Sequence, residues 1–219
     1  MFKELSPAEL ALLSRCKTSN HYKKKQVIFY EGNAPYGVHC VRKGKIKLFR
    51  TTPQGREQIV RLVSSGEAMG FKALLSSDNY SLTAEVLEDS EICFVDKKAF
   101  FEILDHSPKL ARTLLETLAD EVKSQEKTIC SFSQKSVRER VAETVLMLNE
   151  KYGSRAEGGS TITIPLKRED IATLSGTVLE SAVRYLSEFK KDGMIELKGR
   201  EIIVRNSERL LAVTQNKLL

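Results

Sequence analysis

Short runs of hydrophobic residues dominate the first half of the chain, whereas helical spacing dominates the second half. From about Gln26 to Val95, β-branched and aromatic runs alternate with glycines in turn contexts such as Pro53-Gln54-Gly55. Many short strands separated by turns are typical of an antiparallel β-sandwich or roll. We expect strands at VIFY, VHCV, KIKLF, QIVRLV, LTAEV and EICFV, preceded by a short helix over Ser6–Cys16 with Ser6 as its N-cap.

The most regular helical spacing in the chain begins at Ala111. Its inward positions step by four and three through Leu115, Leu118, Val122, Gln125, Ile129 and Phe132. A heptad pattern of this kind predicts a coiled-coil seam, so we expect a dimerisation helix that pairs with the same helix of a second subunit. The alternative is a long helix that packs on its own β-roll. Gln125 interrupts the seam, and such a polar residue either fixes the register or meets a polar group in the gap.

A polar break at Ser133–Ser136 separates this helix from the last third of the chain. The spacing then predicts a helix over Val137–Tyr152 that buries Val137, Val141, Val145 and Leu148. Gly153 and the polar run SRAEGGS end this helix, and Ile162–Leu166 alternates as a strand.

Two short amphipathic segments follow, joined by Ser175-Gly176-Thr177. The first runs from Lys167 to Leu174, and the second runs from Val178 to Lys190 and turns Ala182, Leu186 and Phe189 inward. Glycine supplies the left-handed geometry that a tight turn between crossed helices requires. Met194–Val204 then reads as two strands around a tight Lys198-Gly199 turn, which predicts a wing. A winged helix-turn-helix is therefore favoured over an ordinary helical hairpin with a charged face.

The outward positions of the second helix carry Glu180, Ser181 and Arg184, which are residue types that read base edges in the major groove of DNA. The net charge of +6 suits a polyanionic partner. The basic residues are nevertheless spread evenly. The chain from residue 133 onward holds 15 Lys/Arg against 12 Asp/Glu, and the preceding part holds 20 against 17, which is +3 in each. An electrostatic footprint must therefore come from where individual charges lie.

Other classes of protein find little support in the sequence. The four cysteines (Cys16, Cys40, Cys93 and Cys130) are far apart, so no metal site or iron–sulfur cluster is expected from their spacing. No Walker lysine loop, G-x-S-x-G or H-E-x-x-H motif is present, which argues against an enzyme. The N-terminal residues lack the apolar core of a signal peptide, and no apolar run has the length of a membrane span. We therefore expect a cytoplasmic protein that has no membrane partner.

The order of these parts resembles the Crp/Fnr superfamily of bacterial transcription regulators, over essentially the whole chain. The matching segments are YEGNAPYGVHCVRKGKIKLF, SGEAMGF, RERVAETVLMLNE and KREDIATLSGTVLESAVRYLSEFKKDGMIELKGREIIV, and in detail they look closer to the Fnr branch. The resemblance implies an α+β fold. Its parts would be an antiparallel, cyclic-nucleotide-binding-like β-roll (a double-stranded β-helix) with a short N-terminal helix over 1–106, a dimerisation helix over 107–132, and a winged helix-turn-helix domain over 137–219.

The resemblance also implies an effector pocket between the β-roll and the seam helix, near Gly70, Phe71, Tyr80 and Ser81 on one side and Gln125 and Glu126 on the other. Members that bind cyclic AMP carry a Glu after the Gly of the phosphate-binding turn and an Arg-Ser or Arg-Thr pair further on. Here those positions are Phe71 and Tyr80-Ser81. A buried phosphate without a cation is costly, so cyclic AMP is not expected to bind in the family's manner. An apolar or aromatic ligand, or simple core packing, would suit these residues better.

Two other signals used in the family are also not expected. The Fnr branch holds an iron–sulfur cluster mainly with closely spaced N-terminal cysteines, and only Cys16 lies near that region. Haem-sensing members use a His ligand, for which His21, His39 and His106 are the candidates, although each is more simply a surface or strand residue.

The function that the resemblance implies is a homodimer whose two recognition helices enter successive major grooves of a palindromic site on double-stranded DNA. Glu180 would accept a hydrogen bond from a cytosine, Arg184 would donate two to a guanine, and Ser181 would contact a base edge or a phosphate. The candidate phosphate contacts are Lys167, Arg168, Lys198 and Arg200, and Thr177 is a further candidate DNA-binding residue. RNA polymerase is a further candidate partner. The alternative function is a ligand-binding regulatory module that acts on a partner protein, a class that lacks a winged helix-turn-helix.

Overall fold

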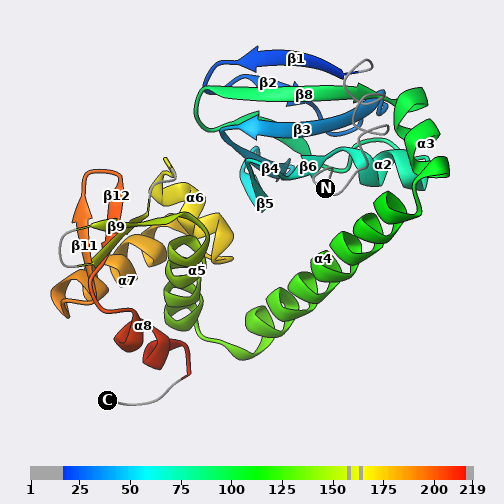
Figure 1. The fold of residues 1–219 in the computed structure, drawn as a ribbon. Coiled ribbons are helices and arrows are strands. Elements are labelled where there is room, and N and C mark those ends of the chain that lie inside the picture. The colour runs from blue at the N-terminus through cyan, green and yellow to red at the C-terminus, as the bar shows by residue number, and fades with distance from the viewer. Residues whose placement is uncertain (1–16, 157–158, 163–164, 216–219) are drawn as a thin grey trace. The chain divides into compact units, whose positions relative to one another are not determined.

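The computed structural model describes residues 17–156, 159–162 and 165–215, so the helix expected over Ser6–Cys16 lies outside the described residues. The chain forms two compact units, which divide between Ser124 and Gln125. Figure 1 shows a β-rich N-terminal unit and a C-terminal unit made of short helices and strands, with the helix α4 running from the first into the second.

The N-terminal unit contains two four-stranded antiparallel sheets (Figure 1). One has the order β1-β8-β3-β6 and the other the order β2-β7-β4-β5. The strands are β1 (Lys17–Tyr22), β2 (Val27–Phe29), β3 (Gly37–Lys43), β4 (Lys45–Thr51), β5 (Glu57–Ser64), β6 (Ala68–Met69), β7 (Thr83–Val86) and β8 (Ser90–Asp96). The predicted β-roll is confirmed, and each of the six hydrophobic runs forms all or most of a strand, with only Tyr30 and Leu82 of these runs lying outside. The sequence did not predict β1, because KTSNHY is largely polar, or β6, because it is two residues long.

The core of the β-roll consists of two hydrophobic clusters. The first includes Phe29, Val41, Tyr80 and Ile92 and lies between the two sheets. The second joins the β1-β8-β3-β6 sheet to the helices α2 (Phe71–Ser76), α3 (Lys97–His106) and the beginning of α4. Gly70 has a φ of 87° at the start of α2, a conformation in which glycine avoids the strain of a side chain.

The long helix α4 runs from Pro108 to Gln134. Leu110 and Leu114 are buried in the second cluster, whereas Leu115, Val122 and Ile129 are 67%, 54% and 67% exposed. The helix continues two residues beyond the predicted seam, so the polar break is shorter than expected. The Ser133 hydroxyl bonds the carbonyl of Cys130 at 3.1 Å, which accommodates a polar residue in the last turn. Only Lys135 and Ser136 remain outside α4 and the next helix.

The C-terminal unit contains helices α5 (Val137–Tyr152), α6 (Arg168–Leu174), α7 (Leu179–Lys191) and α8 (Ser207–Thr214). Its antiparallel sheet has the order β11-β12-β10-β9, formed by β9 (Gly153–Ala156), β10 (Gly159–Ile162), β11 (Ile195–Lys198) and β12 (Glu201–Val204). Ser136 caps α5 through its side chain, which accepts a hydrogen bond from the Glu139 N–H.

Four details of the sequence prediction need correction in this unit. The run that was expected to be a polar loop contains β9 and part of β10, because Ser154 and Thr161 pair across the two strands. Of the strand expected over Ile162–Leu166, Ile162 belongs to β10 and Pro165 and Leu166 belong to no strand, whereas residues 163 and 164 lie outside the described residues. The wing turn is Gly199-Arg200, since Lys198 pairs with Glu201. Val137 is only half-buried because it lies at the first position of α5. None of the helices described is long and apolar enough to cross a membrane.

Candidate nucleic-acid interface

The helix α6 begins at a well-defined cap. The backbone N–H of Lys167 donates a hydrogen bond of 2.7 Å to the Asp170 carboxylate, which is buried. Ile171 and Ala172 of this helix are buried in the core. A carboxylate in the first turn also compensates the positive end of the helix dipole. The start of the first helix of the pair is thereby fixed.

The turn between α6 and α7 is held by buried polar contacts. The Ser175 hydroxyl lies 2.8 Å from the carbonyl oxygen of Ile171 and 2.9 Å from Thr144 Oγ1 of α5. Gly176 has a φ of 61°, and a Cβ at this position would lie 2.9 Å from the ring of Phe132. Glycine is therefore required here both by the backbone and by the closeness of the ring. Phe132, which the sequence assigned to the dimer seam, packs on this turn.

Arg140 of α5 holds the same turn from the other side. Its Nε donates to the carbonyl of Ser175 at 3.0 Å, and its Nη2 donates to that of Gly176 at 3.1 Å. Its Nη1 bonds the carbonyl of Lys135 at 2.8 Å. Sequence reasoning missed this role, because a helical arginine has no pattern that identifies its acceptors. Arg140 thus positions the recognition helix without being available to DNA through these groups.

The recognition helix α7 has one buried face and one exposed face, as predicted. Ala182, Leu186 and Phe189 are buried, and Glu180 and Arg184 are exposed. Ser181 is half-buried. The Arg184 guanidinium lies 4.7 Å above the ring of Tyr185 and donates to its hydroxyl at 3.0 Å, which orients it on the exposed face.

Two exposed valines on this surface were not predicted from the sequence. Val178 precedes α7 and Val183 lies beside Arg184 on the helix, and both are about half-exposed. Apolar side chains at such positions can contact the methyl group of a thymine. The signal that could have identified them is an apolar residue on the otherwise polar outer face of a recognition helix.

The candidate phosphate contacts have different surroundings. Lys167 is exposed and Thr177 is half-buried. Lys198 is exposed and lies 3.4 Å from Glu196 in an ion pair. Arg168 is half-buried, and its Nη2 donates to the carbonyl of Gly199 at 3.0 Å. Burial lowers the pKa of Arg168.

Arg168 therefore holds the wing turn against α6 and is less available to DNA than its position in the sequence suggests. Arg200 lies in that turn with an exposed side chain. The structure thus brings the first helix, the recognition helix and the wing together in one unit, with Lys167, Lys198 and Arg200 at its surface.

Of the four residues expected on the β-roll side of an effector pocket, two belong to the core. Phe71 and Tyr80 are buried, and the Tyr80 ring stacks on Phe29 with the ring centroids 3.9 Å apart. A Cβ on Gly70 would lie 3.3 Å from the Tyr80 ring, so this ring covers the turn that precedes α2. Burial raises the pKa of Tyr80 to about 12. Ser81 is exposed.

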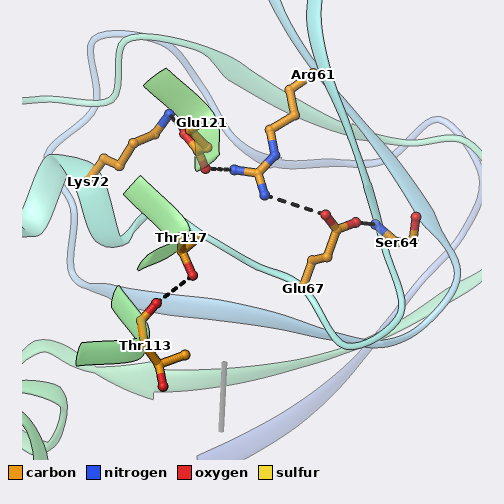
Figure 2. A network of polar contacts seen from close by, with 7 residues as sticks. All are labelled: Arg61, Ser64, Glu67, Lys72, Thr113, Thr117 and Glu121. Atoms are coloured by element: carbon orange, nitrogen blue, oxygen red, sulfur yellow. Dashed lines mark hydrogen bonds and ion pairs between the residues drawn. The ribbon is translucent and has the colours of Figure 1, made fainter. Parts of the chain in front are cut away.

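A polar network beside this turn was not predicted (Figure 2). Glu121 of α4 forms an ion pair with Lys72 of α2 at 2.7 Å and another with Arg61 of β5. Arg61 also lies 3.5 Å from Glu67, which accepts a hydrogen bond from the Ser64 N–H at 2.6 Å. The two cations near the turn are thus both paired with carboxylates. Their partners come from separate stretches of sequence, which is why no local motif reveals them.

The other candidate ligands are dispersed. Gln125 and Glu126 are exposed and belong to the C-terminal unit. His21 and His106 are exposed, whereas His39 is buried between the rings of Phe29 and Phe94. Among the residues described, no three or more His, Cys, Asp or Glu side chains gather in a group that could hold a metal ion.

The sheets of the β-roll and the winged helix-turn-helix define a class of DNA-binding regulators, and comparisons with known proteins agree. Residues 19–107 match the family model of the cyclic nucleotide-binding domain, and residues 139–213 match that of the Crp-like helix-turn-helix domain. The chain belongs to the Crp/Fnr family and is a DNA-binding transcription regulator.

Similar proteins from several bacteria span most of the chain. The fumarate and nitrate reduction regulatory protein of Salmonella typhimurium is 29% identical over 190 residues, which cover 87% of this chain and 76% of that protein. Electron transport regulator A of Shewanella oneidensis is 29% identical over 193 residues, covering 88% and 77%. The structure of FixK2 from Bradyrhizobium japonicum superimposes with a TM-score of 0.79 at 26% identity, covering 90% of this chain and 96% of that one.

Proposed function

We propose that the protein works as a homodimer that places two copies of α7 in successive major grooves of a palindromic DNA site. The observation that carries this proposal is that one chain has both an exposed hydrophobic stripe on α4 and an exposed polar face on α7. The first feature favours a second copy of the chain as its partner. The second requires spacing between two such copies that matches the repeat of DNA.

The stripe on α4 supports self-association. Leu115, Val122 and Ile129 are each seven residues apart, and all three are more than half-exposed in the single chain. Exposed large hydrophobic residues at heptad spacing are costly in water and become stabilising when they pack against an identical helix. Leu118 lies on the border, because it also packs against the β-roll core. Gln125, one heptad after Leu118, would set the register of the pair.

Base recognition is assigned to Glu180 and Arg184, with Ser181 and Val183 as neighbours on the same helix. A guanidinium bonds the O6 and N7 of a guanine, and a carboxylate accepts from the amino group of a cytosine. The stacking on Tyr185 reduces the number of conformations available to Arg184, so less entropy is lost on binding. Lys167, Lys198 and Arg200, with the Thr177 hydroxyl, would contact phosphates and so fix the position of the helix.

The signal is proposed to act where the β-roll meets α4, and cyclic AMP in the family's usual mode is not favoured. The Tyr80 ring covers the Gly70 turn, and Phe71 is buried in the core where a ribose-binding carboxylate would be needed. Arg61 and Lys72 are paired with Glu121, so a cyclic phosphate would have to compete with that carboxylate for either cation. An effector that changes these ion pairs would alter how firmly α4 is attached to the β-roll.

A gel-shift titration with random-sequence duplex DNA at several salt concentrations tests this proposal. A DNA-binding dimer should shift duplex DNA, with an affinity that falls steeply as salt rises because counterions are released. A regulatory module that acts on a partner protein would leave the duplex unshifted even in dilute buffer. A thermal-shift screen of cyclic nucleotides, haem and small metabolites then identifies an effector, because a ligand that binds only the folded state raises Tm.

A further inference from the structure

Cys40 and Cys93 lie directly opposite each other on two neighbouring antiparallel strands, although they are far apart in the sequence. The strands β3 and β8 are neighbours in one sheet (Figure 1). Their register pairs the Cα atoms of Cys40 and Cys93, and both thiols are free and partly exposed. Directly opposite residues in an antiparallel pair have Cα atoms about 4.5–5.5 Å apart and side chains on the same face. A disulfide requires Cα atoms at about 4.4–6.8 Å, so the backbone already satisfies its main condition.

The surroundings distinguish the two thiols. Cys93 Sγ lies 3.5 Å from the hydroxyl of Ser19. Ser19 lies on β1, which pairs with β8 on the side opposite to β3. Cys40 packs against the hydrophobic cluster that holds Leu110 and Leu114 of α4. Burial raises the pKa of the Cys40 thiol to about 12, and the neighbouring Cys93 adds to this effect. Cys40 is therefore the less reactive thiol, and we take Cys93, whose Sγ contacts a hydroxyl, as the thiol that reacts first.

We propose that Cys40 and Cys93 form a reversible disulfide site that is oxidised by hydroperoxides. The Cys93 thiol loses its proton, and the thiolate attacks one oxygen of the peroxide. The O–O bond breaks, a sulfenic acid forms, and the other oxygen takes up the released proton and leaves as water or an alcohol. Cys40 then attacks the sulfenic sulfur. The S–S bond forms, the S–O bond breaks, and the hydroxide leaves as water with the proton of Cys40. The two thiols together lose two electrons, and the peroxide gains these two electrons.

Disulfide formation is expected to change the packing of α4, because Cys40 contacts the cluster that contains Leu110 and Leu114. A disulfide draws Cys40 Sγ towards Cys93 and away from its contacts with the cluster beneath the helix. It also closes a covalent loop between two strands that are already paired, which restricts the unfolded chain. Oxidation is therefore expected to raise Tm of the β-roll and to change the packing that holds the first turns of α4.

The test uses the 219-residue chain with Cys16→Ser and Cys130→Ser, which leaves Cys40 and Cys93 as the only cysteines in that sequence. The protein is treated with hydrogen peroxide, the remaining thiols are alkylated with N-ethylmaleimide, and tryptic peptides are analysed by mass spectrometry. The expected result is loss of both free thiols, a peptide pair linked through Cys40 and Cys93, a higher Tm, and full reversal by dithiothreitol. Circular dichroism before oxidation verifies that the variant is folded.

Two single variants in the same background provide the control. With Cys40→Ser, oxidation should stop at a sulfenic acid on Cys93 that dimedone traps. With Cys93→Ser, Cys40 should stay alkylatable after the same treatment. The proposal is overturned if both thiols are still alkylated after peroxide, or if the disulfide joins two chains. It is also overturned if the chain with all four cysteines instead links Cys93 to Cys16.

Discussion

Glu121 on α4 lies 2.7 Å from Lys72 on α2, and the same carboxylate forms an ion pair with Arg61 on β5 (Figure 2). One acidic residue thus connects the long helix to two separate elements of the β-roll. The Glu121 side chain is 15% exposed, so these pairs are less screened by water than those at the surface. This contact and the hydrophobic packing of Leu110 and Leu114 together attach α4 to the β-roll.

Glu121→Gln should lower the free energy of unfolding by about 1–2 kcal/mol, because Arg61 and Lys72 lose their charged partner in a partly buried setting. Urea denaturation followed by circular dichroism measures this change. Glu116→Gln is the matched control, since Glu116 pairs with Arg112 at 3.0 Å where both side chains are well exposed. Such a surface pair contributes about 0.3–0.5 kcal/mol. Equal effects of the two substitutions would show that the Glu121 network does not attach the helix.

His39 should make the stability of the β-roll depend on pH. Its ring is buried, and Nδ1 has no hydrogen-bond partner within the part of the chain that the structure describes. Burial lowers the pKa of His39 from 6.5 to about 4. The unfolded chain therefore binds a proton that the folded chain does not, so stability is full above pH 6.5 and falls as the pH drops towards 4.

The loss attributable to His39 amounts to about 3 kcal/mol at the acid end of this window. His39→Leu keeps the site apolar and should flatten the dependence of the unfolding free energy on pH between 6.5 and 4. His21→Gln, which removes an exposed histidine, serves as the control. A pH profile of the His39→Leu protein identical to that of the unsubstituted chain would mean that the folded state admits a protonated His39.

Arg184→Ala should weaken binding to a preferred site by about 1–3 kcal/mol and relax the choice of base at one position in each half-site. Lys198→Ala should instead weaken all sequences alike and reduce the slope of log K against log salt by about one unit. Fluorescence anisotropy with preferred and scrambled duplexes at several salt concentrations separates the two effects. If both variants lost affinity equally for the preferred and the scrambled duplexes, Arg184 would not be a base-reading residue.

The substitution Val122→Glu should prevent the proposed dimer from forming, because it places a carboxylate in the middle of the hydrophobic stripe on α4. Val60→Glu is the matched control, since Val60 of β5 is 52% exposed and Val122 is 54% exposed. Sedimentation velocity gives the mass of each species. A Val122→Glu protein that sediments like the unsubstituted chain would contradict the proposal that α4 forms the dimer seam.

The elements that the sequence predicted well are those whose signal is local. The burial of Ala182, Leu186 and Phe189 follows from helical periodicity, and the turn at Gly176 follows from the conformational freedom of glycine. The contacts that were missed join distant stretches. Arg140 reaches the turn carbonyls of Ser175 and Gly176 across more than thirty residues of sequence, and Glu121 reaches Arg61 across sixty.

The same distinction applies within the candidate sites. A basic residue at the start of α6 suggested a phosphate contact, but the Arg168 guanidinium bonds the wing carbonyl of Gly199 because the fold brings that turn within reach. Phe71 and Tyr80 were compatible with either a ligand pocket or core packing, and the structure shows both residues packed in the core. Residue type predicts what a side chain is able to do, whereas the acceptors it meets depend on the tertiary fold.

Two identical recognition helices held at the repeat of duplex DNA are the central claim, and the spacing of half-sites tests it most directly. A palindrome is selected from random duplex DNA, and about 5 base pairs, half a helical turn, are then inserted between its halves. Sedimentation equilibrium and anisotropy should show two chains bound to each original duplex, and the insertion should reduce the affinity to that of non-specific DNA. One chain per duplex, or an affinity that does not change with the insertion, would contradict the account.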